Sequence, residues 1–267
     1  MWDPAVYHRF GEQRSRPFDD LVRQIGADAP RAVTDLGCGS GELTATLAAR
    51  WPRARVTGVD SSPEMIDRAL AAAGPVRFRL GDVRDFTPEP DTDVLVSNAV
   101  LQWVPGHRDL LTRWCAALAP GAWLAVQVPG NFDAPSHRAL RDVARSAPYA
   151  DAVGDTVREA PVDDAPGYAA LLTGAGATVD AWETTYVHLL PAGGAEHPVL
   201  RWMDGTALRP IRAALDAAAW PAFRAELGGR LAAAYPARHG VVAFPFRRIF
   251  VVARTARPAA DRPATQP

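Results

Sequence analysis

The sequence predicts a doubly wound α/β fold with a seven-stranded sheet and helical insertions. Two features of the sequence predict this fold. From Arg31 onward, short apolar runs rich in valine and leucine alternate with longer alanine-rich stretches, as in successive βαβ units. A glycine-rich turn follows the first apolar run, and acidic residues follow the next two. The 267 residues can bury one large core without a second independent domain, so we expect a single elaborated domain.

Each element has its own signal. Strands are expected at residues 31–36, 55–60, 76–81, 92–97 and 122–128, and helical spacing marks residues 41–50, 63–73 and 107–118. The second helix opens with Ser62-Pro63-Glu64, a capping residue followed by proline in the first turn. Residues 177–189 and 248–254 are rich in β-branched and aromatic side chains and would supply a final pair of strands. Two alanine-rich, proline-punctuated stretches, about 131–170 and 195–240, are expected to be helical additions that cap the sheet.

Charge and cysteine content narrow the class of partner. Twenty-nine basic and 30 acidic residues give a net charge of −1 without a polybasic run, so a small-molecule partner is favoured over nucleic acid or membrane. Every basic residue is arginine, which we interpret as codon bias. Cys38 and Cys115 form neither a disulfide framework nor a metal quartet. With no leader-like N-terminus and no apolar run near the roughly 18 residues of a membrane span, a cytoplasmic protein without metal or obligate protein partner is expected.

The most informative segment runs from Val33 to Glu42, VTDLGCGSGE, where a strand enters a glycine turn that opens a helix. Glycines allow a tight turn and the close approach of a ligand. A dinucleotide fingerprint places its third glycine where Glu42 stands, whereas here that glycine comes one residue early, at Gly41. A carboxylate at Glu42 would also repel a pyrophosphate. The pattern indicates either a phosphate-free cofactor or an ordinary strand-to-helix turn.

Two acids lie at matching strand ends. Asp60 ends the second strand, where such folds hold ribose hydroxyls with a carboxylate. Asp82, between Gly81 and Val83, follows the third strand and suits an exocyclic amine of a purine. Either acid alone is better interpreted as a turn or cap carboxylate. Three matched strand ends together favour a ligand site.

The glycine turn, Asp60, Asp82 and the segment Ser97-Asn98-Ala99 after the fourth strand form a pattern. This pattern resembles that of the class I S-adenosylmethionine-dependent methyltransferases. The resemblance implies a Rossmann-like sheet and S-adenosyl-L-methionine as cofactor. It also implies that the glycine turn faces the methionine part, that the second-strand acid holds the ribose, and that the third-strand acid contacts adenine. The implied cofactor-binding residues are Asp35, Gly37, Cys38, Gly39, Gly41, Asp60, Ser61, Asp82, Val83 and Asn98.

Further segments, spread from residue 2 to about 254, resemble the trans-aconitate 2-methyltransferases within that class. They are Trp2-Asp3-Pro4, Tyr7, Phe10, Arg14 to Pro17, Asn98 to Trp103, Gln127 to Asn131, Pro135 to His137, Trp182 to Tyr186, Thr206 to Pro210 and Ala243 to Pro245. The departures are Ser40, where that family often has proline, and a longer segment at Ala192 to His197, near the lid that we expect on the substrate side. The implied reaction passes a methyl group to one carboxylate of trans-aconitate and forms a monomethyl ester.

Such a reaction needs alignment rather than proton transfer, because a carboxylate is already ionised at neutral pH. Gln102 and Trp103 follow the fourth strand and are the expected positioning residues, although Trp103 is also compatible with core packing. The expected substrate-binding residues are Arg14, Arg209, Tyr186 and Tyr7, with Arg16, Arg247 and Arg248 as further candidates; any of these arginines is otherwise a solvated surface residue. His188 is interpreted as structural and Cys38 as a small loop residue.

The expected domain, residues 1–256, is divided into four parts. We expect an N-terminal helical cap at residues 1–30 and a cofactor-binding core at 31–130. Substrate-side insertions with a late strand are expected at 131–240 and a final strand at 241–256. A disordered tail is expected at 257–267. Three alternatives stay open: a methyltransferase for another small acid or a natural-product hydroxyl, a non-catalytic cofactor-binding protein, and a nicotinamide-linked oxidoreductase.

Overall fold

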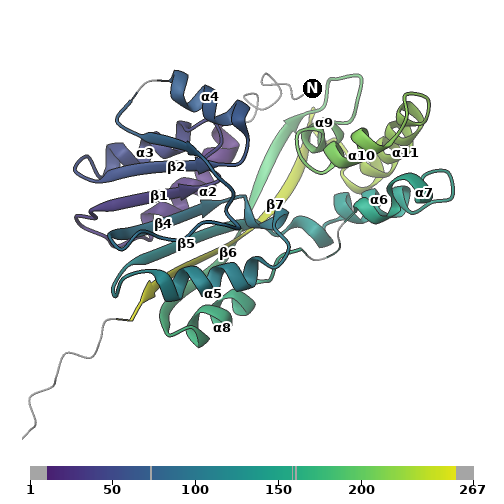
Figure 1. Cartoon of the computed structure of the whole chain (residues 1–267). Coiled ribbons are helices and arrows are strands. Elements are labelled where there is room, and N and C mark those ends of the chain that lie inside the picture. Colours follow the sequence, from purple (N-terminus) through teal and green to yellow (C-terminus); the bar gives the residue numbers. More distant parts are fainter. Residues whose placement is uncertain (1–10, 73, 158, 160, 257–267) are drawn as a thin grey trace, which may run out of the picture. The chain divides into compact units, whose positions relative to one another are not determined.

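The computed structural model describes residues 11–72, 74–157, 159 and 161–256 (Figure 1). Its strands are β1 (Ala32–Leu36), β2 (Arg55–Asp60), β3 (Arg77–Leu80), β4 (Thr92–Asn98), β5 (Trp123–Pro129), β6 (Ala177–Pro191) and β7 (Val241–Thr255). Its helices are α2 (Gly11–Arg23), α3 (Glu42–Arg50), α4 (Pro63–Ala71), α5 (His107–Ala117), α6 (Pro135–Ala144), α7 (Ala150–Val153), α8 (Ala165–Gly174), α9 (Pro198–Asp204), α10 (Leu208–Ala214) and α11 (Ala219–Ala234), with short 3-10 helices η1 (Leu101–Trp103), η2 (Asn131–Asp133) and η3 (Gly154–Thr156).

The strands form one seven-stranded sheet in the order β3-β2-β1-β4-β5-β7-β6. From β3 to β5, neighbouring strands pair in parallel. The chain builds outward from β1 to β3 and then returns to place β4 on the other side of β1, which makes the β1/β4 boundary a topological switch point. Ligands bind at such points outside the carboxyl ends of the strands. The expected doubly wound fold is confirmed.

The first five strands and the three helices between them begin and end within two residues of their predicted bounds. β7 begins at Val241, earlier than the apolar run at residues 248–254 indicated, although within the residues 241–256 expected for the final strand. Pro245 interrupts the apolar run and argues against a strand from sequence alone. In the structure Pro245 lies at an exposed position, while Val242, Phe244 and Phe246 alternate with it toward a hydrophobic cluster. The predicted helical insertions are confirmed as α6, α7 and α8, and as α9 to α11.

The chain forms two compact units. Among the described residues, the sheet unit comprises Ser15–Val128, Val162–Glu183 and residues 249–256. The helical unit comprises Pro129–Pro161, Thr184–Arg248 and residues 11–14. The expectation of a single domain over residues 1–256 stays a prediction. The predicted tail, 257–267, and the first ten residues of the predicted N-terminal cap lie outside the described residues.

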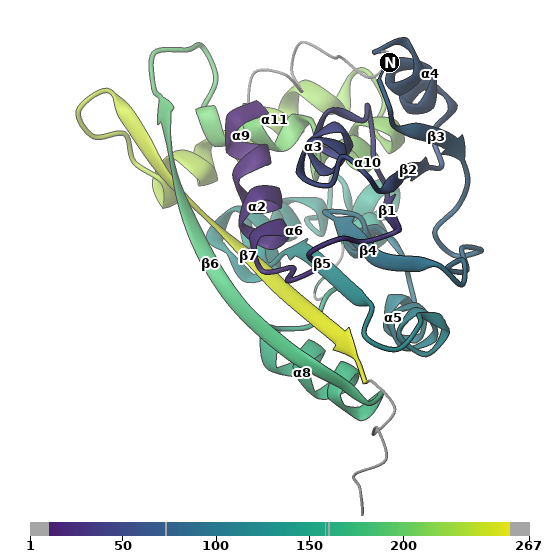
Figure 2. The ribbon, with the colours of Figure 1, turned by 90° about the vertical axis from the view of Figure 1, so that its left-hand side faces the viewer.

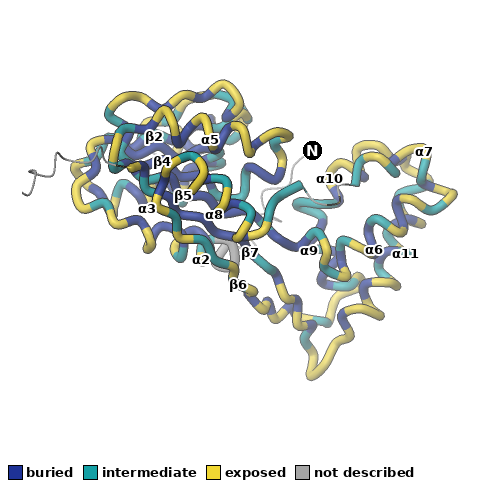
Figure 3. Tube along the Cα trace, turned by 90° about the horizontal axis from the view of Figure 1, so that it is seen from below, coloured by how far each residue is buried: buried dark blue, intermediate teal, exposed yellow. Residues whose placement is uncertain are grey.

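In the sheet unit, α5 and α8 cover one face of the sheet. Leu111 and Trp114 of α5 and Tyr168 of α8 pack with Leu95 and Leu124 in one buried cluster. Figure 2 shows α2 and α3 on the opposite side of these strands from α5, and Figure 3 shows β4 and β5 as mostly buried. The central strands are therefore covered on both faces, as a parallel sheet requires.

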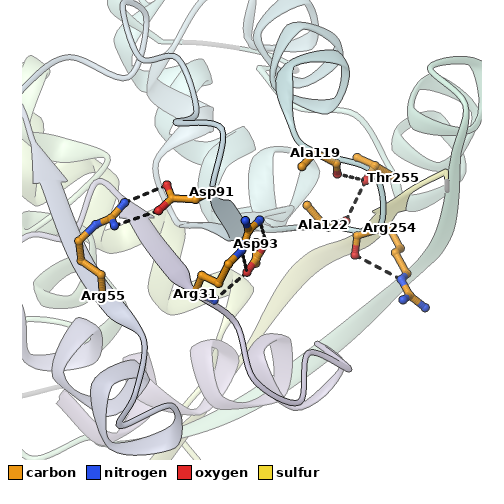
Figure 4. A network of polar contacts seen from close by, with 9 residues as sticks. Arg31, Arg55, Asp91, Asp93, Ala119, Ala122, Arg254 and Thr255 are labelled. Atoms are coloured by element: carbon orange, nitrogen blue, oxygen red, sulfur yellow. Dashed lines mark hydrogen bonds and ion pairs between the residues drawn. The ribbon is translucent and has the colours of Figure 1, made fainter. Parts of the chain in front are cut away.

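Ion pairs hold the amino ends of the strands in the same unit (Figure 4). Arg31 donates to Asp93 from its backbone N–H at 2.7 Å and from Nε and Nη2 at 3.0 and 2.7 Å. Arg55 binds Asp91 with two bonds of 3.0 and 2.9 Å. These bidentate contacts join the starts of β1 and β2 to the start of β4.

The helical unit has its own core. Phe223 and Leu227 of α11, Val143 of α6 and Phe244 of β7 belong to one buried cluster. Arg224, also on α11, donates to Glu196 at 2.7 and 2.9 Å, pairs with Asp204, and lies 5.2 Å from the Trp220 ring. Among the described residues, no helix combines the length and apolarity needed to cross a membrane, and no group of three or more His, Cys, Asp or Glu could hold a metal ion.

Candidate functional site

The glycine turn between β1 and α3 is shaped by left-handed backbone. Gly37, Gly39 and Gly41 have φ of 77°, 55° and 80°, a region that favours glycine. A Cβ at Gly37 would collide with the side chain of Val100, whereas one at Gly39 would meet no heavy atom within 4 Å. The turn is thus closely packed from behind and open above Gly39, which leaves room for a ligand against the backbone.

Asp60 connects the end of β2 to this turn. Its Oδ2 accepts the backbone N–H of Gly39 and its Oδ1 accepts that of Ser62, both at 2.9 Å. A carboxylate offers about four acceptor sites, so Asp60 can still accept hydrogen bonds from further donors. Ser62 also caps α4 as predicted, accepting the N–H of Met65 at 3.4 Å, and the neighbouring Ser61 is exposed.

Asp82, at the end of β3, is held by Arg84. The Nε of Arg84 lies 3.0 Å from both carboxylate oxygens, and its backbone N–H donates to Oδ1 at 2.8 Å. These bonds to the Arg84 side chain and then to its backbone lower the pKa of Asp82 below its usual range. The acid is therefore kept ionised, and it lies next to the buried Val83 in the chain.

Asp35, inside β1, is a buried acid. Its side chain accepts the hydroxyl proton of Thr44 at 2.6 Å, and burial, only partly offset by that bond, raises its pKa to about 6. Burial and the nearby Asp35 and Asp60 raise the pKa of the Cys38 thiol well above its usual range. Cys38 is therefore a poor nucleophile, as predicted.

The turn after β4 is strained. Ala99 has φ of 58°, an uncommon conformation for a residue with a Cβ, and its N–H donates to the Gln127 carbonyl at 2.9 Å. Gln102 is buried and donates from Nε2 to the Ala99 carbonyl at 2.6 Å. Trp103 follows in η1 with 47% of its surface exposed. The structure thus gathers Asn98, Gln102 and Trp103 at one strand end.

Three of the expected substrate-binding residues, Arg14, Tyr186 and Arg209, lie among the described residues, and all three belong to the helical unit. Tyr186 is buried on β6 and Arg209 is exposed on α10. Arg14 lies in α2, and Tyr7 lies outside the described residues. His188 is buried two residues after Tyr186 and stacks on Trp202 at 4.6 Å, which fits its structural interpretation.

The remaining arginine candidates differ in burial. Arg248 is buried with its guanidinium 4.5 Å from the Phe246 ring, and the backbone N–H of Arg247 donates to Asn131 Oδ1 at 2.6 Å. Arg16 lies 3.9 Å from Asp20 on the same helix. Burial of a guanidinium against an aromatic ring is an arrangement that sequence spacing alone does not reveal.

Sequence reasoning missed three supporting residues of the sheet unit. Thr44 binds Asp35 from the first turn of α3, and Arg84 holds Asp82. Phe78 of β3 lies where a Cβ on Gly41 or Gly58 would come within 2.5 and 2.7 Å of its ring. Only Arg84 had a usable signal, since it stands two residues after an acid; the other two depend on nonlocal packing.

Comparisons with known proteins point to one activity. Residues 33–121 match a family described as "Methyltransferase domain". The chain is 56% identical over 258 residues to the trans-aconitate 2-methyltransferase of Mycobacterium sp. (strain KMS), covering 96% of this chain and 100% of that protein.

Two solved structures share the fold at low identity. The YcgJ protein of Bacillus subtilis has a TM-score of 0.57 at 14% identity, covering 91% of this chain and all of that one. Phosphoethanolamine N-methyltransferase 2 of Haemonchus contortus, in complex with S-adenosyl-L-methionine, has a TM-score of 0.52 at 15% identity, covering 91% of this chain and 53% of that one. At these identities the likeness concerns the fold alone.

Proposed function

Because the chain belongs to the trans-aconitate 2-methyltransferase family, we propose that it transfers the methyl group of S-adenosyl-L-methionine to one carboxylate of trans-aconitate, forming the monomethyl ester. The observation that carries the proposal is the 56% identity to a relative of that name over its whole length. The geometry at the carboxyl ends of β1 to β4 supports it.

The strand-end residues fit this cofactor. Open space lies against the backbone at Gly39, where the methionine part would pass. Asp60 keeps acceptor sites for ribose hydroxyls, and Asp82 is an ionised acceptor for the adenine amine. The residues that we propose to hold the cofactor are Asp35, Gly37, Cys38, Gly39, Gly41, Asp60, Ser61, Asp82, Val83 and Asn98.

The bound cofactor supplies an electrophilic methyl group on a sulfonium cation. The protein's task is then to bind the acid and align its oxygen, because a carboxylate with a pKa of about 4 is ionised without a general base. Alignment of the reacting atoms can contribute roughly 7 kcal/mol or more. We propose that Gln102 acts by holding the turn at Ala99, and that the exposed Trp103 ring excludes water.

The substrate is a polyanion, so cationic and hydroxyl side chains are needed to bind it. We propose Arg14, Arg209, Tyr186 and Tyr7 for this role. Arg209 is exposed and therefore open to a ligand, which supports its choice. We further propose that the enzyme works in the cytoplasm without a nucleic-acid, membrane or obligate protein partner; its two cysteines are free thiols, as in a reducing compartment.

The test is a methyl-transfer assay with labelled S-adenosyl-L-methionine that offers trans-aconitate, cis-aconitate, citrate and isocitrate separately, with the product analysed by mass. Selective ester formation from trans-aconitate is expected. Cofactor binding with no ester from any acid would overturn the proposed substrate. Turnover that is unchanged in Arg14→Ala and Arg209→Ala variants would overturn the proposed substrate residues while leaving the reaction standing.

A further inference from the structure

In the part of the chain that the structure describes, two amide side chains at the carboxyl end of the sheet carry buried atoms without a hydrogen-bond partner. Among the described residues, neither Nε2 nor Oε1 of Gln127 has a partner, although this side chain is completely buried. The buried Oδ1 of Asn98 also has none. Buried polar groups are almost always hydrogen-bonded, because leaving one unpaired destabilises the fold by more than an ordinary hydrogen bond stabilises it. The pair therefore indicates a polar partner that binds there.

Asn98 and Gln127 are neighbours on one face of the sheet. They are register partners on the parallel strands β4 and β5, so their side chains point to the same face. Asp35 lies on the same face of the sheet, because it pairs with Val96 and Val96 comes two residues before Asn98 on β4. The amide pair thus lies at the β1/β4 switch point, beyond Asp35 and beside the glycine turn.

The unsatisfied atoms specify the chemistry of the partner. Oδ1 of Asn98 and Oε1 of Gln127 are acceptors, whereas Nε2 of Gln127 is a donor. A ligand that carries only carboxylates can satisfy the donor but neither acceptor. An α-amino acid satisfies both kinds, because its ammonium donates and its carboxylate accepts. Asp35, on the same face, adds a negative group that favours an ammonium.

We propose that Asn98 and Gln127 form an amide pair that binds the amino-acid end of the cofactor. Gln127 is the new member of the site. The inference rests on the proposed function for the identity of the cofactor but not for that of the acceptor acid. Asn98 is half-buried and Gln127 fully buried, so Asn98 is the open end of the pair and Gln127 its closed end.

The test compares two ligands that differ in the amino-acid end. S-adenosylhomocysteine carries it, and 5′-methylthioadenosine lacks it. In a Gln127→Leu variant, calorimetric titration should show a roughly tenfold or greater loss of affinity for S-adenosylhomocysteine and no change for 5′-methylthioadenosine. The melting temperature of the free variant should equal or exceed that of the parent, because an unpaired buried amide has been removed. Gln24→Leu, the same substitution at an exposed position on the chain, should change none of these values.

Three results would overturn the proposal. Unchanged affinity for S-adenosylhomocysteine would show that Gln127 does not bind the cofactor, and an equal loss for both ligands would show that it supports the fold instead. A raised KM for the acid with unchanged cofactor affinity would assign the amide to the acceptor carboxylate. If Gln127→Leu does not fold, Gln127→Met, of similar length and greater adaptability, serves the same comparison. A parent protein inactive on trans-aconitate would contradict the proposed function, whereas the two-ligand comparison would still decide this inference.

Discussion

The carboxylate of Asp60 accepts the backbone N–H of Gly39 at 2.9 Å and so joins the end of β2 to the glycine turn. A charge-assisted bond of this kind both shapes the turn and fixes the direction of the carboxylate. Two segments of the candidate site that are 21 residues apart in the chain therefore depend on one side chain.

Replacing Asp60 should weaken cofactor binding. In Asp60→Ala the acceptor that we propose for the ribose is removed and the N–H of Gly39 loses its partner. The affinity for S-adenosylhomocysteine should therefore fall roughly 10- to 100-fold, measured by calorimetric titration. Asp67→Ala, which removes an exposed aspartate from α4, is the matched control and should bind as the parent does. Equal affinities for the two variants would argue against the role of Asp60.

Gly58 should not tolerate a methyl group. A Cβ there would lie 2.7 Å from Cδ1 of Phe78 and 2.9 Å from Sγ of Cys38. Gly58→Ala should therefore lower the free energy of unfolding by about 1–3 kcal/mol, measured by urea denaturation. Adding Phe78→Leu should recover part of this loss, because the ring is the main obstacle.

The control for that prediction is Gly229→Ala, inside α11, where a Cβ would meet nothing within 4 Å. It should leave stability unchanged or raise it by up to about 1 kcal/mol, as alanine favours helix. A double variant at Gly58 and Phe78 no more stable than Gly58→Ala alone would contradict the steric explanation.

Asp35 should make stability depend on pH. Its pKa is about 6 in the folded protein and about 3.9 in an unfolded chain, so the folded state binds the extra proton between these values. Its contribution to stability therefore declines as pH rises from about 4 to 6 and stays low above that range. Asp35→Asn removes the titration and keeps an acceptor for Thr44. The variant's stability relative to the parent should rise by about 2–3 kcal/mol between pH 4 and pH 8; a difference independent of pH would contradict the buried-acid interpretation.

Arg224 should stabilise the helical unit through geometry as well as charge. Its guanidinium contacts Glu196, Asp204 and the Trp220 ring with 15% of the side chain exposed. Because both acids are partly solvated, Arg224→Ala should lower the free energy of unfolding by about 1–3 kcal/mol, and Arg224→Lys should restore little, since an ammonium cannot form the bidentate contacts.

Arg230→Ala is the control for Arg224. Arg230 pairs with Glu226 and Asp142, but 42% of its side chain is exposed, so its loss should change stability by no more than about 0.5 kcal/mol in thermal or urea unfolding. Similar losses in the two variants would mean that the contacts of Arg224 are no stronger than a surface ion pair. The contact to Glu196 ties the unusually long segment at Ala192 to His197 to α11.

Local signals in the sequence were sufficient for most of the sheet unit. The positive φ values of Gly37, Gly39 and Gly41 are available chiefly to glycine, so the turn could be recognised from those positions. Ser62 followed by Pro63 marked the start of α4, because the capping of a helix depends on residues within its first turn. These features depend on residues that are adjacent in the chain.

Only the tertiary structure decided which distant residues meet. Asn98 and Gln127 share a register position because β4 and β5 pair as they do, and Phe78 restricts Gly58 because β3 lies beside β2. The apolar run at residues 248–254 did not by itself extend β7 back across Pro245, because proline is disfavoured inside strands. By itself, then, the sequence determined the fold class, the glycine turn and the strand-end acids, which follow from local conformational preference. Strand register and burial decided the amide pair and the pKa of Asp35, because both depend on contacts between segments that the chain order does not specify.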